Sequence, residues 1–129
     1  MTFEEFIEIS LNSNTDTEVF TIKLSEEVCH RIQKYTSLNI CNYTFIAEES
    51  YIRHIKNNHE EDLHLLPKLP EVLNSFTHVE KSLTKNGQTG QTDVSLVFRK
   101  KFDDNTVQMV ALRIIRKQTL SLRTLFVKK

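Results

Sequence analysis

Residues 94–127, VSLVFRKKFDDNTVQMVALRIIRKQTLSLRTLFV, decide the fold that we predict for this chain. They contain three runs in which apolar and β-branched residues alternate with polar ones, a pattern typical of β-strands, at 94–98, 106–115 and 120–127. Short segments rich in Asp, Asn, Lys and Gln separate the runs. Because connections this short join antiparallel neighbours, we expect a meander of consecutive strands, with a first strand at 79–83.

The preceding residues have a different texture. Apolar residues at helical spacing, most of them with acidic residues in the first turn, predict four helices. These cover residues 2–11, 25–35, 48–59 and 70–74. Between them, residues 19–24 alternate as a short strand, and residues 44–47 form a short apolar run.

Helices followed by a meander are the α+β pattern. We therefore expect N-terminal helices packed on one face of a C-terminal antiparallel sheet of about four strands. The opposite face is expected to be the working surface, lined by Arg113, Thr124 and Lys128. Gly87 is expected to form the tight turn between the first two strands of the meander.

The composition limits the classes of function. With 129 residues, of which 39% are hydrophobic, the chain suits one domain with one core. Only two glycines and two prolines are present, which excludes a GxGxxG dinucleotide turn and a Walker A loop. No apolar run approaches the roughly 20 residues that span a bilayer, and the acidic start MTFEEFIEIS is unlike a signal peptide. We expect a cytoplasmic protein that makes no membrane contact.

The two cysteines, Cys29 and Cys41, are 12 residues apart and match no CxxC pattern. This spacing indicates neither a disulfide framework nor a thiolate zinc site, so a free thiol is the expected state of each.

Charge is distributed unevenly along the chain, although the net charge is zero. Residues 1–62 carry 12 acidic and 5 basic side chains, whereas residues 63–129 carry 5 acidic and 12 basic ones. A localised basic surface is what a phosphate-binding face requires. The alternative is that these strands place Lys and Arg on their solvent side, where such residues also protect sheet edges. Charge alone does not separate the two interpretations.

Two of the five histidines, His54 and His59, lie on or just beyond one predicted helix. Five residues turn about 140° on an ideal helix, which is poor geometry for chelating one metal ion. We therefore expect no metal site. Both histidines can be ordinary surface residues, and His59 can cap the helix end. Metal-free cleavage of a phosphodiester, however, needs a group that exchanges protons near pH 7, as histidine does.

Such cleavage also needs cations and hydroxyl donors around the phosphoryl oxygens, where charge builds in the transition state. The last strands offer Arg113, Thr124 and Lys128. Strict alternation places Thr124, Phe126 and Lys128 on the same face as the apolar residues of 120–122. The alternative for Arg113 and Lys128 is that they only extend from the sheet rim into solvent.

Three stretches carry a resemblance to a known family. Residues 44–59, TFIAEESYIRHIKNNH, contain a strand followed by a helix with the motif HIxxxH; residues 66–74, LPKLPEVLN, form a Leu-Pro-rich short helix; and residues 122–128, LRTLFVK, contain Thr, an aromatic residue and Lys. In this order they resemble phage-associated RNase domains of the barnase/EndoU/colicin/RelE-like superfamily. The resemblance covers residues 40–129 and leaves residues 1–39 as an N-terminal extension.

The resemblance implies a metal-independent endoribonuclease without a cofactor, encoded by a prophage or acting as a toxin, with RNA as its substrate and tRNA as one class of target. His54 is then the general base on a ribose 2′-hydroxyl, and the product is a 2′,3′-cyclic phosphate. The predicted catalytic residues are His54, His59, Arg113, Thr124 and Lys128, and the predicted RNA-binding residues are Arg99, Lys100, Lys101, Arg116, Lys117 and Arg123. A toxin also implies an immunity protein, with an acidic surface that covers the basic face, and delivery into a target cell.

A second hypothesis is a non-catalytic module of a phage or mobile element that binds nucleic acid or another protein. Its binding survives loss of His54 and weakens steeply with salt. Residues 1–39 are expected to pack against the sheet on the face away from Thr124, because their apolar side chains are too many to leave in water. The alternative for this segment is a mobile docking arm for a partner.

Overall fold

The computed structural model describes residues 1–58 and 60–128, in which four α-helices, one 3-10 helix and six strands follow one another. The helices are α1 (Phe3–Leu11), α2 (Glu26–Thr36), α3 (Glu49–Asn58), the 3-10 helix η1 (Glu60–Lys68) and α4 (Leu69–Ser75). The strands are β1 (Val19–Lys23), β2 (Thr44–Glu48), β3 (His78–Lys85), β4 (Thr92–Lys101), β5 (Thr106–Ile114) and β6 (Thr119–Lys128).

All six strands form one mixed sheet in the order β1-β2-β6-β5-β4-β3. Strands β3 to β6 are the predicted antiparallel meander. The expectation of about four antiparallel strands is nevertheless wrong in two respects, because β1 and β2 join the sheet and β2 runs parallel to β6. The chain passes through three helices and three strands between β2 and β6, and this distant pairing leaves no local sequence signal.

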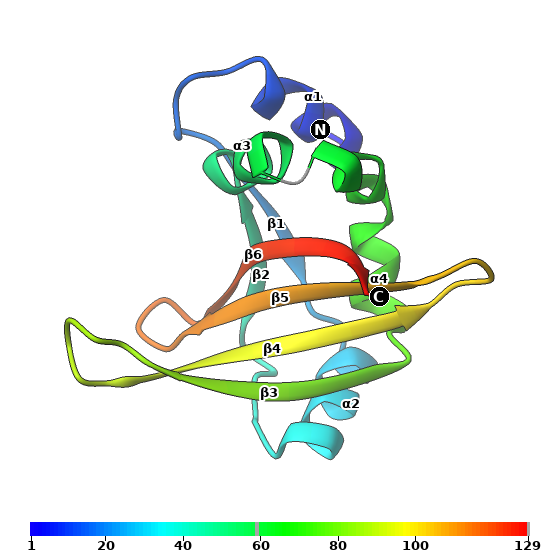
Figure 1. Ribbon diagram of the computed structural model, residues 1–129. Helices are drawn as coiled ribbons and strands as arrows, with labels where there is room; N and C mark the ends of the chain where they lie inside the picture. Colours follow the sequence, from blue (N-terminus) through cyan, green and yellow to red (C-terminus); the bar gives the residue numbers. More distant parts are fainter. Residues whose placement is uncertain (59, 129) are drawn as a thin grey trace.

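The helices form a layer around one side of the sheet (Figure 1). α4 packs against β4 and β5, α3 and η1 pack against β6, and α2 packs against β3. Beneath this layer, apolar side chains from every element form one continuous core. Its largest fully buried members include Phe6, Phe45, Phe76 and Phe98.

Residues 1–39 are packed into this core, unlike a mobile arm. Thr2 and Glu5 cap the N-terminus of α1 with reciprocal hydrogen bonds between side chain and backbone, a capping box. Phe3 and Phe6 are buried, and both rings contact the ring of Phe20 on β1. Burial of these apolar side chains stabilises the folded chain, so the segment is part of the domain.

A β-bulge in β6 changes which residues face the core. Val110 pairs with Thr124 and Ala111 with Leu122, so Arg123 is the extra residue. The alternation therefore reverses: Leu122 and Leu125 are both fully buried, and Thr124 lies on the other face. The expectation that Thr124, Phe126 and Lys128 share the face of Leu122 is wrong because strict alternation does not survive a bulge.

The expectation of two free thiols is also wrong, because Cys29 and Cys41 form a disulfide. Cys29 is buried on α2, and the chain reverses after that helix at Ser37, which has a φ of 65°. The reversal brings Cys41 to a Cα–Cα distance of 5.1 Å from Cys29, within the range that a disulfide spans. The two cysteines can form a disulfide at a sequence separation of 12 because the turn after α2 folds the chain back.

The connection between β3 and β4 differs from the expected tight turn at Gly87. Six residues separate the strands, and it is Gly90 that has a positive φ, of 74°. The side chain of Asn86 accepts hydrogen bonds from the backbone N–H groups of Gln88 and Thr89 and so holds the loop in shape.

Candidate active site

His54 lies on the exposed side of α3, one helical turn before Asn58. Nδ2 of Asn58 lies 3.2 Å from the backbone carbonyl oxygen of His54 and 3.0 Å from Nδ1 of its ring. A carbonyl oxygen only accepts, so the Asn58 atom that faces it is the NH2 group, and this group also donates to Nδ1. In the neutral ring of this arrangement the proton is consequently on Nε2, and Nδ1 carries the lone pair.

A second residue of α3, Tyr51, connects His54 to the sheet. The rings of Tyr51 and His54 meet edge to face, with centroids 6.5 Å apart. On the other side the guanidinium of Arg123, the bulge residue of β6, lies 4.3 Å from the centroid of the Tyr51 ring. Arg123 also donates from Nη1 to Oγ of Ser121 at 3.3 Å. These four residues, Ser121, Arg123, Tyr51 and His54, form what we call the His54 cluster.

Arg123 has no acidic partner in the described part of the chain, unlike Arg99 and Arg53. Among the described residues, no carboxylate lies within ion-pair distance of Arg123. Arg99, in contrast, pairs with Glu80 at 2.7 Å and donates to Gln108 at 2.9 Å, and Arg53 pairs with Glu49. The half-buried Arg123 therefore presents a cation without an acid to neutralise it, on the Tyr51 ring that also contacts His54, an arrangement that suits a phosphate group.

The structure does not bring the predicted catalytic residues together. Thr124 follows Arg123 directly and lies near the His54 cluster, on the face opposite the core. Arg113 pairs with the buried Leu120, so it lies on the other face and nearer the start of β6. Lys128 is at the far end of β6, five residues beyond Arg123 and roughly 16 Å along the strand. His59 lies outside the described residues.

The predicted RNA-binding residues are also divided between surfaces. Arg99 and Lys101 point to the open face of β4, whereas Lys100 pairs with the buried Val107 and points to the helix side. Arg116 and Lys117 are exposed in the connection between β5 and β6. Only Arg123 of this set belongs to the His54 cluster.

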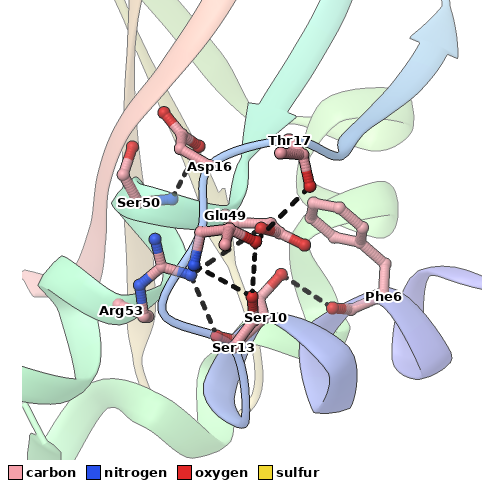
Figure 2. A network of polar contacts seen from close by, with 9 residues as sticks. Phe6, Ser10, Ser13, Asp16, Thr17, Glu49, Ser50 and Arg53 are labelled. Atoms are coloured by element: carbon pink, nitrogen blue, oxygen red, sulfur yellow. Dashed lines mark hydrogen bonds and ion pairs between the residues drawn. The ribbon is translucent and has the colours of Figure 1, made fainter.

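A buried polar network holds the start of α3 against α1 (Figure 2). The carboxylate of Glu49 is 1% exposed and lies 3.8 Å from Nη1 of Arg53, which also donates to the carbonyl oxygen of Ser10 at 3.3 Å. Asp16 accepts a hydrogen bond from the backbone N–H of Ser50 at 3.2 Å. Figure 2 shows the side chains of Glu49 and Arg53 pointing towards Ser10 of α1, while Asp16 lies apart from them beside Ser50. They position the helix that carries Tyr51 and His54.

Three members of the site were not singled out from the sequence, namely Tyr51, Asn58 and Ser121. Tyr51 and Asn58 lie three residues before and four residues after His54, spacings that place them on one helix face. That spacing was the available signal. Ser121 gave none, because its role depends on the bulge at Arg123.

Two features are missing from the described residues. No group of three or more His, Cys, Asp and Glu side chains gathers where it could hold a metal ion. Residues 1–58 and 60–128 also contain no helix with both the length and the apolar character that a membrane span needs.

Comparison with known proteins identifies the family. No curated protein and no solved structure matches the chain. One family model, described as phage-Barnase-EndoU-ColicinE5/D-RelE like nuclease3, matches residues 23–129, which include β2, all of α3 and the whole meander. The resemblance seen in the sequence is thereby confirmed. The match begins within β1, whereas the division of the chain at residue 39 stays a prediction. The chain belongs to the phage-Barnase-EndoU-ColicinE5/D-RelE like nuclease3 family.

Proposed function

We propose that the protein is a metal-independent endoribonuclease that cleaves RNA at the His54 cluster. The family supports a nuclease role. The observation that carries the proposal is the Arg123 guanidinium, which has no described carboxylate partner and is held over the ring of Tyr51, which also contacts the exposed ring of His54.

In this proposal the scissile phosphate binds at Arg123. The planar guanidinium keeps N–H donors beyond the one given to Ser121, and these can hold two phosphoryl oxygens at once. The hydroxyl of Thr124, the next residue, donates to a third oxygen. Both groups stabilise the negative charge that builds on the phosphorus substituents in the transition state.

His54 acts as the general base in the reaction. The ribose 2′-oxygen attacks phosphorus while its proton moves to Nε2 of His54, and the bond from phosphorus to the 5′-oxygen breaks. The leaving 5′-oxygen takes a proton from water, and the products are a 2′,3′-cyclic phosphate and a 5′-hydroxyl. A base of this kind contributes about 10²–10⁴-fold to the rate.

Asn58 controls which nitrogen of His54 can accept that proton. While its NH2 group donates to Nδ1, Nε2 of the neutral ring carries a proton and cannot act as a base. When the amide turns, Oδ1 accepts from Nδ1–H instead, and the lone pair moves to Nε2. Asn58 is therefore a positioning residue that supports both forms of the ring in turn.

The test is a cleavage assay on end-labelled RNA with EDTA present. Wild-type protein is expected to form fragments with 2′,3′-cyclic phosphate ends, and His54→Ala and Arg123→Gln are each expected to lower the rate at least 100-fold. The matched controls are His30→Ala, an exposed histidine on α2, and Arg31→Gln, whose guanidinium lies 4.1 Å from the Phe76 ring, away from the site. Controls with folded circular dichroism spectra are expected to keep wild-type activity.

Three results would favour another mechanism or another function. Activity that EDTA abolishes excludes the metal-free reaction. Activity that survives His54→Ala removes the assigned base. RNA binding without any cleavage favours the non-catalytic module, whose affinity falls steeply with salt and does not depend on His54.

A further inference from the structure

A hollow lies where β4 and β5 separate, away from the His54 cluster. The two strands pair from Lys101 and Thr106 only as far as Ser95 and Leu112. Beyond this point β4 continues along β3 to Thr92, and β5 continues along β6 to Ile114. The strands thus form a fork, whose two arms are the hairpin ends at the left of Figure 1. The space between the arms is about 370 Å³.

The charged residues that line the fork are mostly basic. Arg113, Arg116 and Lys117 line it, against a single acid, Asp93. The nearest described partner of Asp93 is Nδ2 of Asn86, at 3.5 Å. No described residue forms a salt bridge with any of the three cations. The excess of two positive charges in a concave site favours a bound anion.

Arg113 provides the most specific sign of a missing ligand. Its Nε is buried and has no hydrogen-bond partner among the described residues. Leaving a buried donor of a charged group without a partner costs free energy that a bound oxygen acceptor recovers. The backbone edges that β4 and β5 turn towards each other in the fork are also outside the ladder between these two strands.

We propose that this fork binds a backbone phosphate of the same RNA strand that is cleaved at the His54 cluster. Arg113 holds the phosphate through its guanidinium, whose Nε is buried, and Arg116 and Lys117 add positive charge from the connection between β5 and β6. The identification of the ligand as RNA rests on the proposed function. The preference of the fork for an anion does not, because its charge is the same whether or not His54 is catalytic.

The position of the fork agrees with an extended ligand. Arg113 pairs with Leu120 and Arg123 lies three residues further along β6, a separation of roughly 10 Å along the strand. Because Arg113 lies on the opposite face of the sheet from Thr124, an RNA strand bound at both sites passes around the connection between β5 and β6, where Arg116 and Lys117 are exposed. The fork then binds a nucleotide that is not adjacent to the scissile bond, and its effect grows with the length of the RNA.

The test measures binding, in a His54→Ala background so that no cleavage interferes. Fluorescence anisotropy with labelled single-stranded RNA of increasing length, over a salt series, gives the affinity and its salt dependence. Arg113→Gln is expected to weaken binding of the longer RNAs about tenfold and to lower the slope of log affinity against log salt by about 0.7, the value for one phosphate contact of a single strand. The matched control, Lys34→Gln on the acidic half of the chain, is expected to change neither.

Arg116→Gln serves as a second variant, because an exposed residue in a strand connection can change without unfolding the protein. It is expected to lower the salt slope in the same direction as Arg113→Gln. If both variants bind RNA with the affinity and slope of the Lys34→Gln control, the proposal is overturned even if cleavage is confirmed.

If the protein binds no RNA, inorganic pyrophosphate tests whether the fork still binds an anion. Its titration is followed by NMR at the Arg113 Nε–H and the amides of residues 113–117. A protein that binds no RNA, but shows saturable shifts there, has a site for a free phosphate compound, which refutes the proposed function and the RNA assignment together. Absence of both RNA binding and these shifts refutes the anion site itself.

Discussion

Replacement of Arg53 by Met tests whether the buried network of Figure 2 holds α3 in place. The variant keeps an unbranched apolar stem but removes the partner of the Glu49 carboxylate, which is 1% exposed, and the donor to the Ser10 carbonyl oxygen. Breaking a buried pair from one side costs about 3–5 kcal/mol. Arg53 itself is 21% exposed, so water reaches part of the site. We therefore expect a loss near the lower limit, about 3 kcal/mol.

The assay is urea unfolding followed by circular dichroism, in a double-mutant cycle with Glu49→Gln. With the carboxylate replaced by a neutral amide, the Arg53→Met change leaves no buried charge unpaired. We expect the two losses to be non-additive, with a coupling energy of about 2 kcal/mol. Lys56→Met, an exposed residue on the same helix, is the control and should change stability by less than about 0.5 kcal/mol.

Additive losses, or a loss below about 1 kcal/mol for Arg53→Met alone, would show that the pair behaves as a surface salt bridge. In that case the network does not position α3. A further readout links it to function: if α3 is displaced, the Arg53→Met variant also loses RNA cleavage, whereas Lys56→Met does not.

Three other changes have defined outcomes. Asn58→Leu should lower kcat about tenfold with KM unchanged, whereas Asn58→Asp, which accepts from Nδ1–H of His54, should keep more activity than Asn58→Leu; equal losses in the two variants would contradict the role of residue 58 in placing the lone pair on Nε2. Cys41→Ser should destabilise the protein by about 3 kcal/mol, the entropy of closing a loop of this length, and shift the melting temperature by about 10 °C; an unchanged melting temperature under oxidising conditions would contradict this. Deletion of Arg123 should cost about 2 kcal/mol or more, because the buried Leu125 turns outward, while Arg123→Ala keeps the bulge and should remain folded; a deletion variant as stable as Arg123→Ala would show that the bulge does not set the register.

Patterns with a short period were sufficient for the local elements. The meander of β3 to β6 follows from two-residue alternation and from the turn residues between its runs. The N-terminal helices follow from their caps and apolar spacing, as in the Thr2 capping box. Neither pattern carries information on which distant segments pair, so the parallel contact of β2 with β6 was not foreseen.

The candidate site depends on that unforeseen contact. Because β2 runs parallel to β6, α3 begins at the point along β6 where the bulge occurs, and Tyr51 meets Arg123 there. Alternation alone placed Thr124 with the core leucines and selected Arg113 and Lys128 as its companions on a single face. The extra residue reverses the following positions, so the half-buried Arg123 lies against Tyr51 beside His54, and Arg113 is left on the other face at the fork. The bulge interrupts the pairing of β5 with β6. It thus separates Arg123, which we assign to cleavage, from Arg113, which we assign to holding the RNA strand.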